Sequence, residues 1–218
     1  MRGIHNWYDS EDHFYDHSKP WITHVSTQTA QFYNGIKWMQ QYKKPLLFDE
    51  MRYEGDVPSG WGNLTGKQMA SYFWMATLSG GYGTHGETFK NGADDTTEVR
   101  WWAKGGKLVG ESIERIHFFQ SVIKQVPHLK MTPSINDNGN PKKLESNIYV
   151  LSNPGENYLA YVADAGQTIE LNLPGSSSYN LQVIDTWNMK IEQQTTIAPG
   201  MFKYKTAEPY TAIRVYAK

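Results

Sequence analysis

Hydrophobic runs in the first 125 residues alternate with segments of helical period. Three runs have the length of a strand: residues 21–26, 46–49 and 81–85. Three other segments place apolar side chains on one helical face: residues 30–42, 67–79 and 112–125. Strands that alternate with helices are typical of βαβ units. This part of the chain therefore predicts a parallel sheet covered by helices.

The helix over residues 67–79 has start and stop signals at both ends. Thr65 and Gln68 have the spacing of a capping box, and Gly80 and Gly81 follow the last helical residue. The apolar face between these signals consists of Met69, Tyr72, Phe73 and Ala76. We therefore expect a helix that begins and ends at these signals.

The pattern changes near residue 130. Residues 130–144 are rich in Pro, Asn, Asp, Gly and Lys, which predicts a linker and hairpin. About seven short runs with β character and turn residues between them follow. They cover residues 148–151, 158–163, 168–173, 179–186, 190–197, 202–205 and 212–216. Such strands predict an antiparallel β-sandwich over residues 131–218, after an α/β domain over residues 1–130.

Composition narrows the classes of function. A net charge of −1 argues against binding to nucleic acid or to an anionic membrane surface. The aromatic content of 14% can fill a core, but aromatic rings also stack on sugars, which favours a carbohydrate partner. Cysteine is absent, so disulfides and thiolate metal sites are excluded. No stretch has membrane-spanning length. No motif predicts a cofactor, and His13 and His17, four residues apart, lie outside any helical pattern that would favour a metal site.

Polar side chains follow two of the predicted strands. Asp49 and Glu50 come at the end of the second strand, and His85 and Glu87 follow the third. Because the carboxyl ends of parallel strands meet at one edge of a sheet, these groups predict a polar pocket there. The α/β part contains only three strand–helix pairs in about 125 residues, whereas a complete (β/α)8 barrel takes about 200 to 250 residues.

Five segments, in order, resemble the apiosidase-like glycoside hydrolases of clan A. They begin with Ile4-His-Asn6 and Lys19-Pro-Trp-Ile-Thr-His-Val-Ser-Thr-Gln28. They continue with Lys44-Pro-Leu-Leu-Phe-Asp-Glu-Met-Arg-Tyr-Glu-Gly55, Gly80-Gly-Tyr-Gly-Thr-His-Gly-Glu-Thr88 and Trp101-Trp-Ala-Lys-Gly-Gly-Lys-Leu-Val-Gly-Glu-Ser112. The resemblance implies a retaining (β/α)8 barrel ahead of a small β-sandwich, which some relatives carry as a candidate collagen-binding domain. We therefore expect an α/β plus all-β chain: a partial (β/α)8 (TIM) barrel, about strands 5 to 8, followed by a small antiparallel β-sandwich.

The resemblance also implies catalytic roles. Glu50 matches the nucleophile position at the end of the seventh barrel strand. The acid/base motif of the family, an Asn-Glu pair upstream, has no counterpart here, and His5 would fall near the fifth strand. Retaining hydrolysis needs two carboxylates about 5 to 5.5 Å apart. The chain is thus expected to be the carboxyl-terminal part of a longer glycosidase and to be inactive alone.

Alternative roles accompany these candidates. Glu54 is a second candidate nucleophile, Glu50 could instead be a solvated loop carboxylate, and Asp49 is expected to bond a neighbouring strand. The expected substrate-binding residues are His5, His24, Tyr53, Trp61, His85, Glu87, Trp101 and Trp102. Against sugar binding, the histidines could be purely structural, Glu87 could pair with Arg52 or Arg100, and the tryptophans could cover the barrel bottom or an interdomain seam.

The sequence is compatible with two functions. One is a portion of a glycoside hydrolase that acts on polysaccharide glycosides. The other is a non-catalytic carbohydrate-binding or interaction remnant of such an enzyme. The expected partner is a carbohydrate, with no nucleic acid and no membrane. A partial barrel also leaves sheet edges unpaired, so a homodimer or another association through the open edge is expected.

Overall fold

The computed structural model describes residues 1–8, 10–56, 61–84, 88, 110–135 and 148–218. It is a mixed α/β protein, and its chain divides into two compact units. The first unit contains residues 1–77 and 81–116, and the second contains residues 78–80 and 117–218. The predicted domain boundary at residue 130 stays a prediction. No helix within the described ranges is long and apolar enough to cross a membrane.

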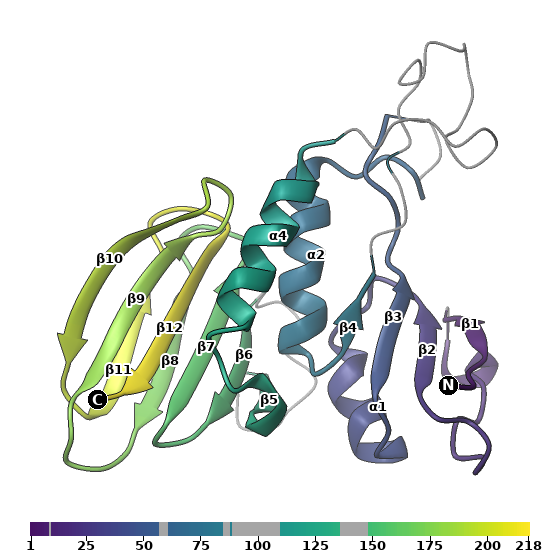
Figure 1. Cartoon of the computed structure of the whole chain (residues 1–218), viewed down its shortest axis with the longest axis horizontal. Coiled ribbons are helices and arrows are strands. Elements are labelled where there is room, and N and C mark those ends of the chain that lie inside the picture. The colour runs from purple at the N-terminus through teal and green to yellow at the C-terminus, as the bar shows by residue number, and fades with distance from the viewer. Residues whose placement is uncertain (9, 57–60, 85–87, 89–109, 136–147) are drawn as a thin grey trace. The chain divides into compact units, whose positions relative to one another are not determined.

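A four-stranded parallel sheet forms the first unit, in the order β1-β2-β3-β4 (Figure 1). Its strands are β1 (His5–Trp7), β2 (Val25–Gln28), β3 (Leu46–Glu50) and β4 (Tyr82–Gly83). A short 3-10 helix, η1 (Glu11–His13), follows β1. The helix α1 (Asn34–Tyr42) connects β2 to β3, and α2 (Gly66–Leu78) connects β3 to β4. The predicted alternation of strands and helices is confirmed for these elements.

One face of β3 carries the core of the first unit. Leu46 and Phe48 are fully buried, whereas the residues between and after them are half-buried. The Phe48 ring lies 5.0 Å from the Phe32 ring, which in turn lies 5.0 Å from Tyr72 of α2. Trp38 of α1 also packs against the Phe48 ring, with 6.3 Å between the ring centroids. The helices therefore cover the Phe48 face, and Asp49 belongs to the opposite face, as alternation along a strand requires.

The capping box of α2 is confirmed. The Gln68 amide N–H donates to the Thr65 hydroxyl at 3.2 Å, and the Thr65 amide N–H donates to the Gln68 side-chain oxygen at 2.9 Å. At the other end, Gly80 has a φ of +87°, a conformation that glycine adopts without steric cost. The Gly81 N–H then donates to the carbonyl of Ala76 at 3.0 Å. Local sequence alone is enough to place this helix.

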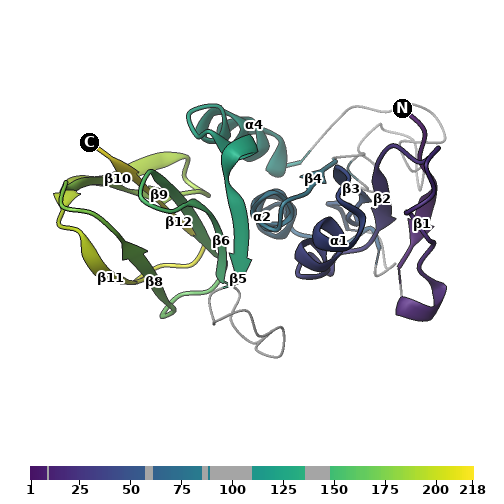
Figure 2. The same ribbon diagram turned by 90° about the horizontal axis from the view of Figure 1, so that it is seen from below.

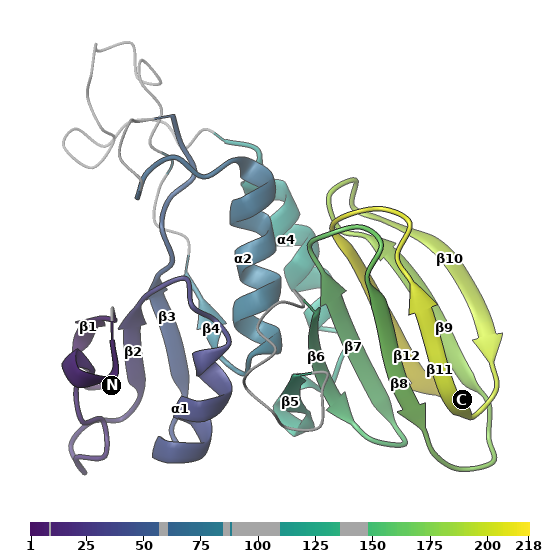
Figure 3. The ribbon, with the colours of Figure 1, turned by 180° about the vertical axis from the view of Figure 1, so that it is seen from behind.

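Two antiparallel sheets form the second unit (Figure 3). The six-stranded sheet has the order β10-β9-β12-β7-β6-β5, and the two-stranded sheet pairs β11 with β8. The strands are β5 (Thr132–Ile135), β6 (Ile148–Asn153), β7 (Asn157–Val162), β8 (Thr168–Leu173), β9 (Tyr179–Asp185), β10 (Lys190–Ile197), β11 (Gly200–Lys205) and β12 (Thr211–Ala217). All seven predicted β runs form strands.

Strand β5 is not among the seven predicted strands. Residues 132–135 lie in the predicted linker and hairpin, and they pair antiparallel with β6, with Pro133 opposite Leu151. The proline is tolerated because β5 is the last strand of its sheet, where one side of the strand needs no ladder partner. The helix α4 (Ser112–Ile123) and the 3-10 helix η2 (His128–Lys130) precede this strand, and the boundary between the two units falls within α4.

The two sheets of the second unit face each other (Figure 2), and they share one hydrophobic core. Tyr158 and Ala160 of β7 lie in this core together with Ile169 and Leu171 of β8. Tyr204 of β11 packs against it from the two-stranded sheet. The alternate β7 residues on the opposite face, such as Leu159, are also fully buried. At β7 the six-stranded sheet is therefore covered on both faces.

Candidate active site

The carboxyl end of β3 contains a β-bulge. In the pairing with β2, Thr27 lies opposite Phe48 and Gln28 lies opposite Glu50, so Asp49 is an extra residue without a partner. A bulge changes the direction of the side chains next to it. This explains how two consecutive residues, Asp49 and Glu50, both lie within reach of the same side chain on β1.

That side chain is His5. Its Nδ1 lies 3.0 Å from Oδ2 of Asp49. Its Nε2 lies 3.2 Å from Oε1 of Gln28 and 3.6 Å from Oε2 of Glu50. Partial burial by itself lowers the pKa of His5, but the hydrogen bond and charge of Asp49, helped by Gln28 and Glu50, outweigh it and raise the pKa above 6.5. Together His5, Gln28, Asp49, Glu50 and Trp61 form the strand-end cluster.

Glu50 is held from its other side by Trp61. The indole Nε1 donates to Oε1 of Glu50 at 2.6 Å. Trp61 is in turn fixed by its backbone, because its carbonyl accepts from the Tyr53 N–H at 2.9 Å. The Glu50 side chain remains 24% exposed. It is therefore a carboxylate with a defined orientation that a ligand can still reach.

Asp49 is bonded to the neighbouring strand, as the sequence predicted. The Ser26 hydroxyl on β2 donates to Oδ2, the same oxygen that faces His5. The Thr84 hydroxyl donates to the Asp49 backbone carbonyl at 2.7 Å. Among the described residues, no side chain or backbone group bonds the buried Oδ1 of Asp49. Asp49 thus connects β1, β2 and the segment after β4.

Glu54, the alternative nucleophile, is committed to the start of α4. Its side chain accepts from the Glu111 N–H at 2.7 Å, the Ser112 N–H at 3.1 Å and the Ser112 hydroxyl at 2.5 Å. Only 2% of Glu54 is exposed. Gly110 packs so closely that a Cβ there would lie 2.7 Å from Oε2. Both carboxylate oxygens are therefore occupied by the helix N-terminus, and this alternative is wrong.

The other predicted site residues divide into three groups. His5, Trp61 and, through its backbone, Tyr53 lie at the strand-end cluster. His24 does not lie there. It directly precedes β2, and because β2 and β3 are parallel, the start of β2 lies at the other edge of the sheet from the carboxyl end of β3. The remaining four, His85, Glu87, Trp101 and Trp102, lie outside the described residues, so their roles stay predictions.

Gln28, Ser26 and Thr84 are site residues that the sequence reading missed. The predicted strand ended at residue 26, but β2 continues to Gln28. Ser26 and Gln28 are two residues apart on one strand, a spacing that places both on one face. A longer strand prediction would have included Gln28, whereas Ser26 and Thr84 already lay within predicted strands and only their contacts reveal them. In the described ranges, the strand-end cluster included, no group of three or more His, Asp or Glu side chains is arranged to hold a metal ion.

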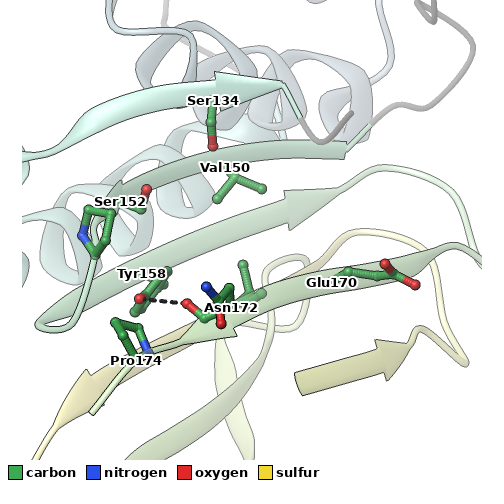
Figure 4. Close-up of a pocket in the computed structure, with 9 residues that line it drawn as sticks. Ser134, Val150, Ser152, Tyr158, Glu170, Asn172 and Pro174 are labelled. Carbon is green, nitrogen blue, oxygen red and sulfur yellow. Dashed lines mark hydrogen bonds between the residues drawn. The ribbon is translucent and has the colours of Figure 1, made fainter. Parts of the chain in front are cut away.

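A shallow pocket of about 230 Å³ lies in the second unit, between β6, β7 and β8 (Figure 4). The Tyr158 hydroxyl in this pocket donates to the Asn172 carbonyl at 2.8 Å and accepts from the Gly155 N–H at 2.8 Å. The Glu170 carboxylate in its wall pairs with Lys203 at 2.6 Å. The Tyr158 hydroxyl and the Glu170 carboxylate of this pocket therefore already have partners within the fold.

One family model matches part of the second unit. A domain of unknown function, DUF5605, matches residues 147–216, which are the strands β6 to β12. No curated protein matches the sequence.

Solved structures similar to the chain are glycoside hydrolases by description. A candidate glycoside hydrolase from Bacteroides vulgatus ATCC 8482 shares 23% identity with a TM-score of 0.72, over 94% of this chain and 43% of that protein. A glycoside hydrolase family 5 protein from the same organism shares 14% identity with a TM-score of 0.62, over 84% of this chain and 45% of that protein. The chain therefore has a glycoside-hydrolase-like fold and spans less than half the length of these structures.

Proposed function

We propose that this chain is the nucleophile-bearing portion of a retaining glycoside hydrolase of the clan A type. In this proposal the parallel sheet is part of a (β/α)8 barrel, about strands 5 to 8, and the second unit is a β-sandwich accessory domain. One observation carries the proposal. Glu50, at the carboxyl end of a parallel strand, is oriented by the Trp61 N–H yet remains open to a ligand.

The proposed chemistry follows from this geometry. A Glu50 oxygen attacks the anomeric carbon, the bond to the leaving oxygen breaks, and a carboxylic acid supplied from outside the described residues protonates that oxygen. Water then cleaves the glycosyl ester and restores the carboxylate. Tyr53 and Trp61 would contact the sugar, with His85, Glu87, Trp101 and Trp102 as further proposed contacts. His24 is not among the proposed sugar contacts, because it lies before β2 at the other edge of the sheet.

A labelling experiment on the chain itself tests the nucleophile. Fluoride is a leaving group that needs little protonation, so a 2-deoxy-2-fluoro glycosyl fluoride can react without a general acid. We expect a panel of such fluorides to leave one covalent glycosyl adduct, and peptide fragmentation by mass spectrometry should place it on Glu50. Glu50→Gln should remove the adduct.

The matched control is Glu114→Gln, which removes an exposed carboxylate from α4. It should label like the unchanged chain. An adduct that maps to Glu54, or one that persists in Glu50→Gln, would show that the nucleophile is misassigned. In a longer enzyme that supplies the general acid, Glu50→Gln should abolish hydrolysis of an aryl glycoside and leave the circular dichroism spectrum unchanged.

The second candidate function is non-catalytic carbohydrate binding. It is favoured by the bonding of Asp49, the carboxylate that shares His5 with Glu50, because this side chain is held by Ser26 of the neighbouring strand. Binding without reaction would produce saturable titration with an oligosaccharide and no covalent adduct with any fluoride. The two candidates therefore differ in a single mass measurement.

A further inference from the structure

We propose that His5 is a positioning residue: anchored on Asp49 as a doubly protonated cation, it holds the Glu50 carboxylate in its reactive orientation. This inference rests on the proposed function of Glu50 and assigns to His5 a role other than sugar binding. It follows from the contacts of the two imidazole nitrogens and the two Glu50 oxygens.

Both nitrogens of His5 face acceptors. Nδ1 faces a carboxylate oxygen of Asp49 at 3.0 Å, and Nε2 faces the side-chain oxygen of Gln28 at 3.2 Å. A neutral imidazole has only one N–H and would leave one of these contacts without a proton. The doubly protonated ring donates in both directions. The direction of the His5 pKa, raised above 6.5, agrees with this geometry.

The two oxygens of Glu50 face different groups. Oε1 accepts from the Trp61 indole at 2.6 Å, and Oε2 lies 3.6 Å from Nε2 of His5. The carboxylate is thus bounded on one side by a neutral donor and on the other by a cation. The hydrogen bond from the indole fixes one oxygen of Glu50. The charge of His5 attracts the other oxygen without a direct hydrogen bond, because its Nε2 faces Gln28.

The charge of His5 would act most in the second half of the reaction. When the glycosyl ester is hydrolysed, water adds to the anomeric carbon and the bond from that carbon to the Glu50 oxygen breaks. Its electron pair returns to the carboxylate, so negative charge develops beside His5. A cation at this position stabilises the departing carboxylate. Loss of His5 should therefore slow release of the sugar from the enzyme.

The first test uses the chain as it is. NMR titration of the histidines, with His5 assigned through His5→Gln, should give a His5 pKa above 6.5. The charged groups that face His5 are Asp49 and Glu50. Asp49→Asn should lower the His5 pKa, and Glu50→Gln should lower it less, because Glu50 is farther away. If His5 titrates at 6.5 and neither variant changes its pKa, the inference is wrong.

The second test measures the labelled chain. The glycosyl adduct on Glu50 should decay at least about 10-fold more slowly in His5→Gln than in the unchanged chain, because a misplaced or uncompensated carboxylate is a poorer leaving group. His117→Gln, which replaces an exposed histidine of α4, is the matched control and should decay at the normal rate. Equal decay in His5→Gln would overturn the positioning role.

These tests separate the inference from the proposed function. If no fluoride labels Glu50, the proposed function fails, while the NMR titration still decides whether Asp49 holds His5 in its protonated form. If Glu50 is labelled but the adduct decays at the normal rate in His5→Gln, and neither Asp49→Asn nor Glu50→Gln changes the His5 pKa, the function stands and the inference fails. If Asp49→Asn does not fold, Glu50→Gln alone tests the coupling.

Discussion

The two units of this protein use their strands differently. The first unit pairs short parallel strands of two to five residues and collects polar side chains at one edge of its sheet. The second unit pairs antiparallel strands of four to eight residues around a shared apolar core. In the first unit the carboxylates of Asp49 and Glu50 face another ionisable group, His5. The comparison shows that ionisable side chains gather in the less extensively paired unit, whereas the other unit is stabilised by its own core.

Core truncations test this comparison with the largest expected effect. Ile213→Ala, at a fully buried position of β12, should lower the free energy of unfolding by about 2–5 kcal/mol, and Phe48→Ala on β3 by about 3–5 kcal/mol. Hydrogen exchange read peptide by peptide should show the greater loss of protection in the unit that carries the change. Equal loss in both units after either substitution would contradict separate cores.

A substitution of the buried Glu54 tests how much its hydrogen bonds to the N-terminus of α4 stabilise the first unit. Glu54→Gln replaces an acceptor that faces three donors with an amide that has only one oxygen, so we expect a loss of about 1–3 kcal/mol by chemical denaturation. Thr65→Ala removes the capping hydroxyl of α2 and should cost about 1 kcal/mol. An effect of Glu54→Gln no larger than that of Thr65→Ala would show that the buried carboxylate is a minor contributor.

The open edges of the parallel sheet distinguish the first unit by self-association, which is the smallest of the expected effects. In the described residues β1 pairs only with β2, and β4 only with β3. Trp7 on β1 is 65% exposed and Tyr82 on β4 is 45% exposed. We expect the chain to self-associate, with a mass by light scattering that rises with concentration. Trp7→Lys should reduce this rise. A monodisperse monomer at all concentrations would contradict association through the edge strands.

Much of the fold could be predicted from the sequence because its signals are local. The capping box at Thr65, the glycines after α2 and the seven β runs after residue 147 each depend on residues close together in the chain. Strand β5 was missed for the opposite reason. Its residues look like a linker, and only pairing with β6, across residues 136–147, makes them a strand.

The candidate site shows the same division. The hydrophobic run before Glu50 was enough to predict that this residue ends a strand of a parallel sheet, because the signals for strands and turns depend on residues that are close together in the sequence. Only the tertiary structure decided that Asp49 forms a bulge, that His5 lies between two carboxylates, and that Glu54 caps a helix 58 residues later in the chain. These contacts join segments far apart in sequence, and whether a carboxylate attacks or caps depends on which donors the folded chain brings to it.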